Sequence, residues 1–145
     1  MTVWVVCADS ARARIFSAES ARDQLSEVQD LSHPESRIRP RDMVSDRDGR
    51  RADSVGRGMH GVGGERDEPK REEAERFART LGQTLNEAGR SGRYQRLHIL
   101  AAPAFLGLLR HHLADDVRTL LRSETAANIV TQGIKEIRAH LPERL

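Results

Sequence analysis

One segment constrains the fold more than any other: residues 33–68 carry many charges and glycines but few large apolar side chains. Eight of these residues are arginines, and six glycines lie between Gly49 and Gly64. Such a segment cannot bury enough surface to offset the entropy lost when it becomes ordered. A long loop of this kind within a compact domain is typically functional or disordered. We therefore expect residues 33–68 to be a long loop that carries the function.

The residues on either side of this segment predict alternating strands and helices. The apolar, β-branched run at 3–7 is typical of a strand buried on both faces, and 13–17 and 27–31 are its predicted antiparallel partners. Pro69 suits the first position of a helix whose apolar stripe runs to Ala88 and which ends at Gly89 or Gly92. Further strands are predicted at 97–101 and 122–127, and further helices at 104–112, 115–121 and 132–141.

The predicted order of elements is therefore β-β-β-α-β-α-β-α. Three antiparallel strands followed by alternating helices and strands predict an α/β fold with a mixed five-stranded sheet and helices on its faces. The ribonuclease H-like architecture has the same order. A length of 145 residues suits one domain over 1–145.

Composition excludes several classes of protein. The single cysteine, Cys7, leaves no internal disulfide framework and no cysteine-based zinc site. Residues 1–10 lack the basic region of a signal peptide. The longest mainly apolar stretch, 99–109, contains a proline and a glycine and is too short to span a bilayer. We therefore expect a soluble, cytoplasmic chain without membrane insertion.

The charge pattern favours phosphate contacts over base stacking. The 24 basic residues, of which only Lys70 and Lys135 are lysine, nearly balance 22 acidic ones, and aromatic residues make up only 3% of the chain. Guanidinium groups on a segment without a core can bind phosphate and become ordered on binding. The alternative is a loop held by its own Arg–Asp pairs. The candidate phosphate-binding residues are Arg37, Arg39, Arg41, Arg47, Arg50, Arg51 and Arg57.

Catalytic groups are patterned less clearly. Residues Gly56–Gly61 match the dinucleotide-binding pattern G-x-G-x-x-G. Dinucleotide binding also requires a strand before that motif and a helix that starts at its third glycine, whereas an Asp- and Arg-rich loop precedes it here. The adjacent His111 and His112 diverge by roughly 100° on a helix, which does not suit a shared metal. We expect neither a metal nor a cofactor. A hydrolase acting on a phosphoester or ester bond is the alternative function. Its candidate acids, bases or ligands are Asp9, Asp46, Asp53, His60 and Glu65.

A ribonuclease-type metal cluster would need further carboxylates near Asp9. Glu72 or Glu75 on the long helix could supply one, but the strand at 97–102 ends without an acid. We expect Asp9 to be a turn residue, the two glutamates to be solvated helix charges, and His98 to be packed inside the sheet.

Several stretches resemble the bacterial host-attachment protein family, and the resemblance covers nearly the whole chain in order. The loop motifs are His33–Arg37, Asp42–Arg50 and Asp53-Ser54, and the later ones are Glu73–Ala78, Ala102–Arg110 and Arg138–Glu143. The family takes its name from a surface-attachment phenotype, which implies no molecular mechanism.

That family is similar to the central domain of archaeal and eukaryotic peptide-release factors. In those proteins a Gly-Gly-Gln loop tip before a long helix assists hydrolysis of the peptidyl-tRNA ester bond. Gly63-Gly64-Glu65 occupies the similar place here. A glutamate carboxylate is acceptor-only and cannot reproduce the donors of the amide. The resemblance therefore implies association with the ribosome or structured RNA more than release activity.

Together these features predict a non-catalytic interaction module that binds RNA or the ribosome through the loop at 33–68. The alternative is a hydrolase on a phosphoester or peptidyl-tRNA ester bond. A third reading is a homo-oligomer whose loop mediates self-association.

Overall fold

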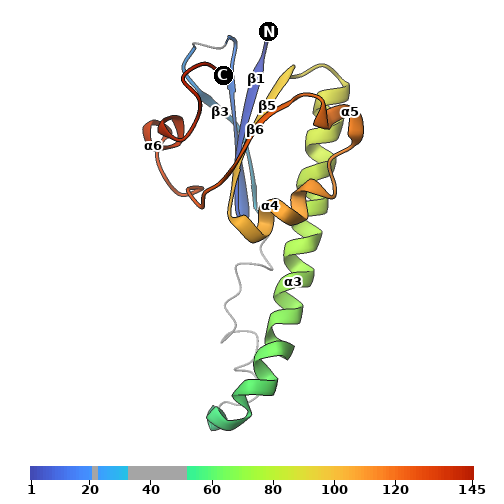
Figure 1. Ribbon diagram of the computed structural model, residues 1–145, viewed down its shortest axis with the longest axis vertical. Helices are drawn as coiled ribbons and strands as arrows, with labels where there is room; N and C mark the ends of the chain where they lie inside the picture. The colour runs from blue at the N-terminus through green and yellow to red at the C-terminus, as the bar shows by residue number, and fades with distance from the viewer. Residues whose placement is uncertain (21–22, 33–51) are drawn as a thin grey trace.

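The computed structural model describes residues 1–20, 23–32 and 52–145, with the side chains of its longest helix from Lys70 onward. The described chain contains one five-stranded sheet with the strand order β3-β2-β1-β5-β6 (Figure 1). Its strands are β1 (Val3–Ala8), β2 (Arg12–Ala18), β3 (Ser26–Ser32), β5 (Arg96–Ala101) and β6 (Leu121–Ala126). β1 pairs antiparallel with β2 and β2 with β3, whereas β1–β5 and β5–β6 are parallel. The predicted mixed sheet and the predicted order of elements are confirmed.

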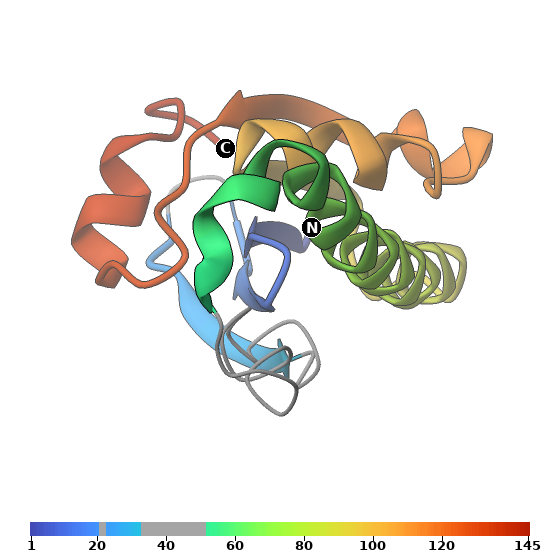
Figure 2. The same cartoon turned by 90° about the horizontal axis from the view of Figure 1, so that it is seen from below.

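Helices cover both faces of the sheet. They are α3 (Ala52–Arg90), α4 (Pro103–Arg110), α5 (Asp115–Arg118) and α6 (Ile134–Ala139). Helices α3, α4 and α5 lie on one face, and α6 lies on the other (Figures 1 and 2). No helix in the described part of the chain is long and apolar enough to cross a membrane.

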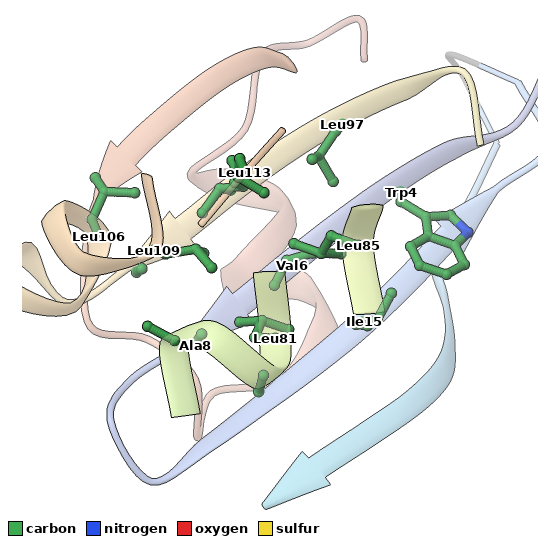
Figure 3. Close-up of a cluster of buried hydrophobic side chains, with 14 of the residues drawn as sticks. Trp4, Val6, Ala8, Ile15, Leu81, Leu85, Leu97, Leu106, Leu109 and Leu113 are labelled. Atoms are coloured by element: carbon green, nitrogen blue, oxygen red, sulfur yellow. The ribbon is translucent and has the colours of Figure 1, made fainter. Parts of the chain in front are cut away.

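The side chains of β1 alternate between two cores, as expected for a strand buried on both faces. Trp4, Val6 and Ala8 pack towards α3 and α4, where α3 contributes Leu81 and Leu85 (Figure 3). The other side chains of β1 pack towards α6 and the residues that follow it. All six residues of β1 are buried, so the sequence-based interpretation of 3–7 is confirmed.

The start of α3 corrects the predicted loop. Residues 52–68 were expected to belong to a loop, with the helix starting at Pro69, but α3 begins at Ala52. The glycines of Gly56–Gly61 and the expected loop tip Gly63-Gly64-Glu65 therefore lie within a helix. Once a helix is nucleated, each added residue contributes about one backbone hydrogen bond. Glycine in a helix costs only about 1 kcal/mol relative to alanine, so it does not have to end the helix. Pro69 has no backbone N–H and therefore removes one helical hydrogen bond, yet the helix continues through this position.

The C-terminal end of α3 follows the prediction more closely. The helix ends at Arg90, and Gly92 has a φ of 78°, the left-handed conformation that favours glycine. The N–H of Arg93 donates to the carbonyl of Ala88 over 2.9 Å and closes the end of the helix. Tyr94 then turns back, stacks on Trp4 with ring centroids 4.9 Å apart, and donates its hydroxyl to the carbonyl of Leu85.

Candidate nucleic-acid interface

The carboxyl ends of the three parallel strands meet at one edge of the sheet. The pairing register aligns Ala8 of β1 with Ala101 of β5, and Ala101 with Ala126 of β6. Helix α4 starts at this edge directly after Ala102. Ligands of open α/β sheets bind outside the carboxyl ends of the strands. We therefore take this edge, called the carboxyl edge below, as the candidate functional site.

β3, the strand that precedes the arginine-rich segment, ends at the carboxyl edge. Ser32, the last residue of β3, pairs with Arg12 at the start of β2, and Ala8 pairs with Ala13. Ser32 thus lies at the same edge of the sheet as the carboxyl end of β1, with β2 between them. The first turns of α3 extend past the same edge, well beyond the sheet (Figure 1). Both described flanks of residues 33–51 therefore lie on the carboxyl-edge side of the molecule.

Asp9 lies at the carboxyl edge, but its carboxylate is used to close a turn. Its Oδ1 accepts hydrogen bonds from the backbone N–H groups of Ala11 and Arg12, over 2.8 and 3.0 Å. The interpretation of Asp9 as a turn residue is confirmed. The other acid proposed beside it, Glu75, lies 2.6 Å from Nε2 of His112. Among the described residues, no group of three or more His, Cys, Asp or Glu side chains is arranged to hold a metal ion.

The other predicted site residues fall into two groups. Arg37, Arg39, Arg41, Arg47, Arg50, Arg51 and Asp46 lie outside the described residues. Asp53, Arg57, His60, Gly63, Gly64 and Glu65 lie in the first turns of α3, where the backbone is described. The structure thus brings the second group onto one helix, beyond the carboxyl edge.

The described part of α3 continues the basic character of the segment. Lys70, Arg71 and Arg79 are exposed. Neither Arg71 nor Arg79 has an ionic partner among the described side chains. Arg76 is also exposed and donates to Glu73 over 2.7 Å. The helix therefore exposes basic side chains to solvent just before and within the half that packs on the sheet.

Two polar contacts escaped the sequence analysis because they join residues far apart in the chain. Asn86 on α3 donates to the carbonyl of His112 and accepts from the N–H of Ala114, each over 2.9 Å. With the Glu75–His112 contact, these bonds fasten α3 to the chain between α4 and α5. No local pattern signals them, since each partner lies 26 to 37 residues away.

His98 is confirmed as a packed strand residue. It is 1% exposed, and its Nδ1 lies 2.7 Å from Oγ of Ser123 on the neighbouring strand. Burial lowers the pKa of His98 to about 4, and the charges of Arg138, Arg96 and Arg122 act in the same direction. The ring is therefore neutral near pH 7, and it lies on the α6 face, away from the carboxyl edge.

The structure has the class of fold that the sequence predicts, an α/β domain with a mixed five-stranded sheet. Residues 4–141 match the family described as "Protein required for attachment to host cells". The chain belongs to this family. No curated protein matches the sequence.

Two archaeal structures are among those similar to this chain. One is the archaeal translation termination factor aRF1, at 13% identity and a TM-score of 0.49, with 93% of this chain covered. The other is described only as an archaeal protein, at 14% identity, a TM-score of 0.49 and 94% coverage. This chain spans about a third of each, 32% in both cases.

Proposed function

We propose that the chain is a non-catalytic interaction module that binds structured RNA, with the ribosome as its expected partner. The observation that carries the proposal is the position of the two described flanks of residues 33–51. β3 ends at Ser32 on the carboxyl edge, with β2 between it and β1, and the first turns of α3 extend past the same edge. Ligand sites of open α/β sheets form at this edge, and seven arginines of the segment are the proposed phosphate contacts: Arg37, Arg39, Arg41, Arg47, Arg50, Arg51 and Arg57.

The exposed side chains at the base of α3 extend the proposed surface. Lys70 and Arg71 are exposed on the turns that link the arm of α3, the turns that extend past the carboxyl edge, to its packed half. Guanidinium groups bind phosphate oxygens through their planar fork of donors. A phosphate backbone following α3 would therefore meet basic groups along the arm and at its base.

The first test is an affinity pull-down from native lysate, with and without ribonuclease. We expect ribosomal RNA in the eluate and loss of the captured partners after ribonuclease treatment. Replacing Arg37, Arg39 and Arg41 by alanine should reduce capture. A matched variant with Arg79, Arg90 and Arg118 replaced, which removes the same charge from exposed helical positions, should reduce it less. Partners retained after ribonuclease treatment would contradict RNA as the ligand.

A divalent-metal titration separates this proposal from the hydrolase alternative. A hydrolase built on Asp46, Asp53, His60 or Glu65 as ligands predicts a thermal shift with Mg²⁺ or Mn²⁺ and cleavage of RNA or of the peptidyl-tRNA ester bond. The interaction module predicts binding without cleavage. Metal-dependent cleavage that is lost in Asp53→Asn would replace the present proposal.

The description of the family adds a role in attachment to host cells, and we propose that this role needs the same segment. Cells lacking the protein should regain attachment when they carry the wild-type chain or the Arg79, Arg90 and Arg118 variant. Cells carrying the Arg37, Arg39 and Arg41 variant should attach poorly. Equal attachment by both variants would separate the attachment role from these arginines.

A further inference from the structure

Helix α4 is apolar on its inner and on its outer side. Arg110 is the single charged residue among its eight. Phe105, Leu106 and Leu109 are buried and pack on the core that α4 shares with α3. A helix at the surface of a domain normally carries polar side chains on the side away from the core, and a helix that is apolar all round is normally covered. The outer side of α4 therefore does not match its position in the monomer.

The outer face of α4 consists of four small or apolar residues: Pro103, Ala104, Gly107 and Leu108. At 3.6 residues per turn they fall within an arc of about 140°, opposite the three buried residues. Pro103 and Ala104 are exposed, and Gly107 and Leu108 are half-buried. A Cβ added at Gly107 would meet no described atom outside the local helix within 4 Å, so the space over the middle of the helix is open. Another backbone can therefore approach α4 closely at this point.

The chemistry of this face selects the kind of partner. None of its four side chains has a charge or a hydrogen-bonding group, whereas RNA binding relies on cations that contact phosphate. An uncovered apolar face gains free energy when it is buried against another apolar surface. A second copy of the chain offers such a surface, because a two-fold axis brings the same residues of two copies together.

The two ends of α4 carry complementary charge. The first turn has no acidic residue, and Ala102 at the N-cap makes no side-chain hydrogen bond, so the positive end of the helix dipole is not compensated. At the other end, Arg110 donates from Nε to Oε1 of Glu124 on β6 over 2.7 Å. In an antiparallel pair of α4 helices, the first turn of each copy lies beside the end that holds Glu124 in the other. The two helix dipoles then also oppose each other favourably.

We propose that the outer face of α4 is a dimer interface between two copies of this chain. The two α4 helices pack antiparallel about a two-fold axis that passes beside Gly107, where the missing side chain lets the backbones come close. Ala104 of each copy then packs against Leu108 of the other. An eight-residue helix supplies only part of the roughly 800 Å² per partner that is typical of stable interfaces, so the dimer forms reversibly and depends on concentration.

This interface goes beyond the proposed RNA binding and uses none of residues 33–68. α4 lies at the lower end of the sheet, beside α3 (Figure 1). The chain can therefore dimerise without binding RNA, and it can bind RNA without dimerising. Removing nucleic acid from the sample separates the two proposals, because RNA could otherwise bridge two copies.

The test is sedimentation equilibrium of the full chain after ribonuclease treatment and removal of nucleic acid, over a concentration series up to about 1 mM. We expect the mass to rise from the 16.3 kDa of one chain towards twice that value, with a single dissociation constant. A mass that stays at 16.3 kDa throughout would overturn the proposal. Growth beyond two chains would overturn it as well, since a two-fold interface closes at the dimer.

Two matched variants link dimerisation to the outer face of α4. Ala104→Arg brings like charges together across the axis and should weaken dimerisation at least about tenfold. Gln83→Arg adds the same charge at an exposed position of α3 and should leave the dissociation constant unchanged. Circular dichroism and urea unfolding confirm that both variants are folded. Equal dissociation constants for the wild type and Ala104→Arg would place the interface elsewhere and overturn the proposal.

A cysteine at the axis tests the arrangement of the two helices. A disulfide needs Cα atoms within about 7 Å, so Gly107→Cys should link to its counterpart under mild oxidation, and Gln83→Cys should not. The native Cys7 is buried and does not compete. A Gly107→Cys chain that forms no linked dimer, or that links no faster than Gln83→Cys, would contradict the antiparallel packing about this residue.

Discussion

At the scale of single residues, one close approach lies where α3 meets the chain between α4 and α5. Gly82 on α3 faces His112, and Asn86 one turn later satisfies two backbone groups of the same chain segment. A side chain at 82 would displace that backbone. The helical stripe in the sequence identifies the buried face of α3, but it does not show that this position must be glycine.

Gly82→Ala and Gly107→Ala should therefore change stability in opposite directions. A Cβ at residue 82 would lie 2.6 Å from the Cβ of His112 and 2.8 Å from its carbonyl oxygen, so we expect a loss of about 1–3 kcal/mol. Around Gly107 on α4, no described atom outside the local helix lies within 4 Å of the added Cβ. Alanine there should gain roughly 0.5–1 kcal/mol from helix propensity. Urea unfolding measures both effects, and a stabilised Gly82→Ala would contradict the packing described here.

His98 should make the domain less stable in mild acid. Its pKa is lowered from 6.5 to about 4 in the fold, so between these values the unfolded chain binds a proton that the folded chain does not. Stability is therefore lost as the pH falls from about 7 to about 4, and the loss levels off below that. A shift of this size corresponds to about 3 kcal/mol.

The matched variant for this pH dependence is His98→Gln, which does not titrate. Between pH 7.5 and 4.5, urea unfolding should show a loss about 2–3 kcal/mol larger for the wild type than for the variant. Parallel pH profiles of the two proteins would show that His98 is not the group responsible. Any overall destabilisation by the substitution does not affect this comparison, because only the difference between the two pH values is used.

At the scale of elements, β1 and β2 were predictable because burial imposes clear patterns on them. β1 is apolar at every position and β2 is largely buried, whereas β3 is mostly exposed and shows only weak alternation. Helix α5 is shorter than predicted, Asp115–Arg118 in place of 115–121, because the chain enters β6 at Leu121. Strand and helix periods thus identify the elements, while their ends depend on tertiary contacts.

The start of α3 could not be predicted in the same way. Glycine content and Pro69 both favour a loop, and residues 52–68 hold few large apolar side chains that would argue for a helix. Glu75 was expected to be a solvated helix charge, but it lies against His112. Local preferences are overruled here by a helix that continues from its packed half, which is fastened to the chain between α4 and α5.

Arg14 is the side chain that joins β2, β3 and the segment before α6. It donates to both carboxylate oxygens of Glu27 and to the carbonyls of Val130 and Gln132. Because the side chain is only 14% exposed, Arg14→Ala should lower the free energy of unfolding by about 2–3 kcal/mol. Arg14→Lys should recover only part of this, since an ammonium group lacks the planar fork.

Arg90 is the matched control for Arg14. It also makes two hydrogen bonds to one carboxylate, that of Asp116, but both side chains are more than half exposed. Exposed ion pairs contribute at most about 1 kcal/mol, so Arg90→Ala should have little effect. Similar losses in Arg14→Ala and Arg90→Ala would show that the carbonyl contacts of Arg14 do not stabilise the fold.

At the scale of the whole molecule, charge and shape define two different sides. The net charge is only +2, so attraction to a polyanion depends on where the arginines gather and not on the total. The arm of α3 and the carboxyl edge lie at one end of the molecule, and α6 covers the other face of the sheet (Figure 1). The sequence predicts the gathering of arginines at 33–68 through its composition.

The salt dependence of RNA binding tests the central claim most directly. The association constant for a structured ribosomal RNA is measured across a series of salt concentrations for the wild type and for variants with three or seven of the segment's arginines replaced by alanine. Each lost phosphate contact should reduce the slope of log K against log salt by about 0.7–0.9, which gives about 2–3 for Arg37, Arg39 and Arg41 and about 5–6 for all seven. The matched variant of Arg79, Arg90 and Arg118 should keep the larger part of the wild-type slope. Equal slopes and affinities for the wild type and the seven-arginine variant would contradict RNA binding through this segment.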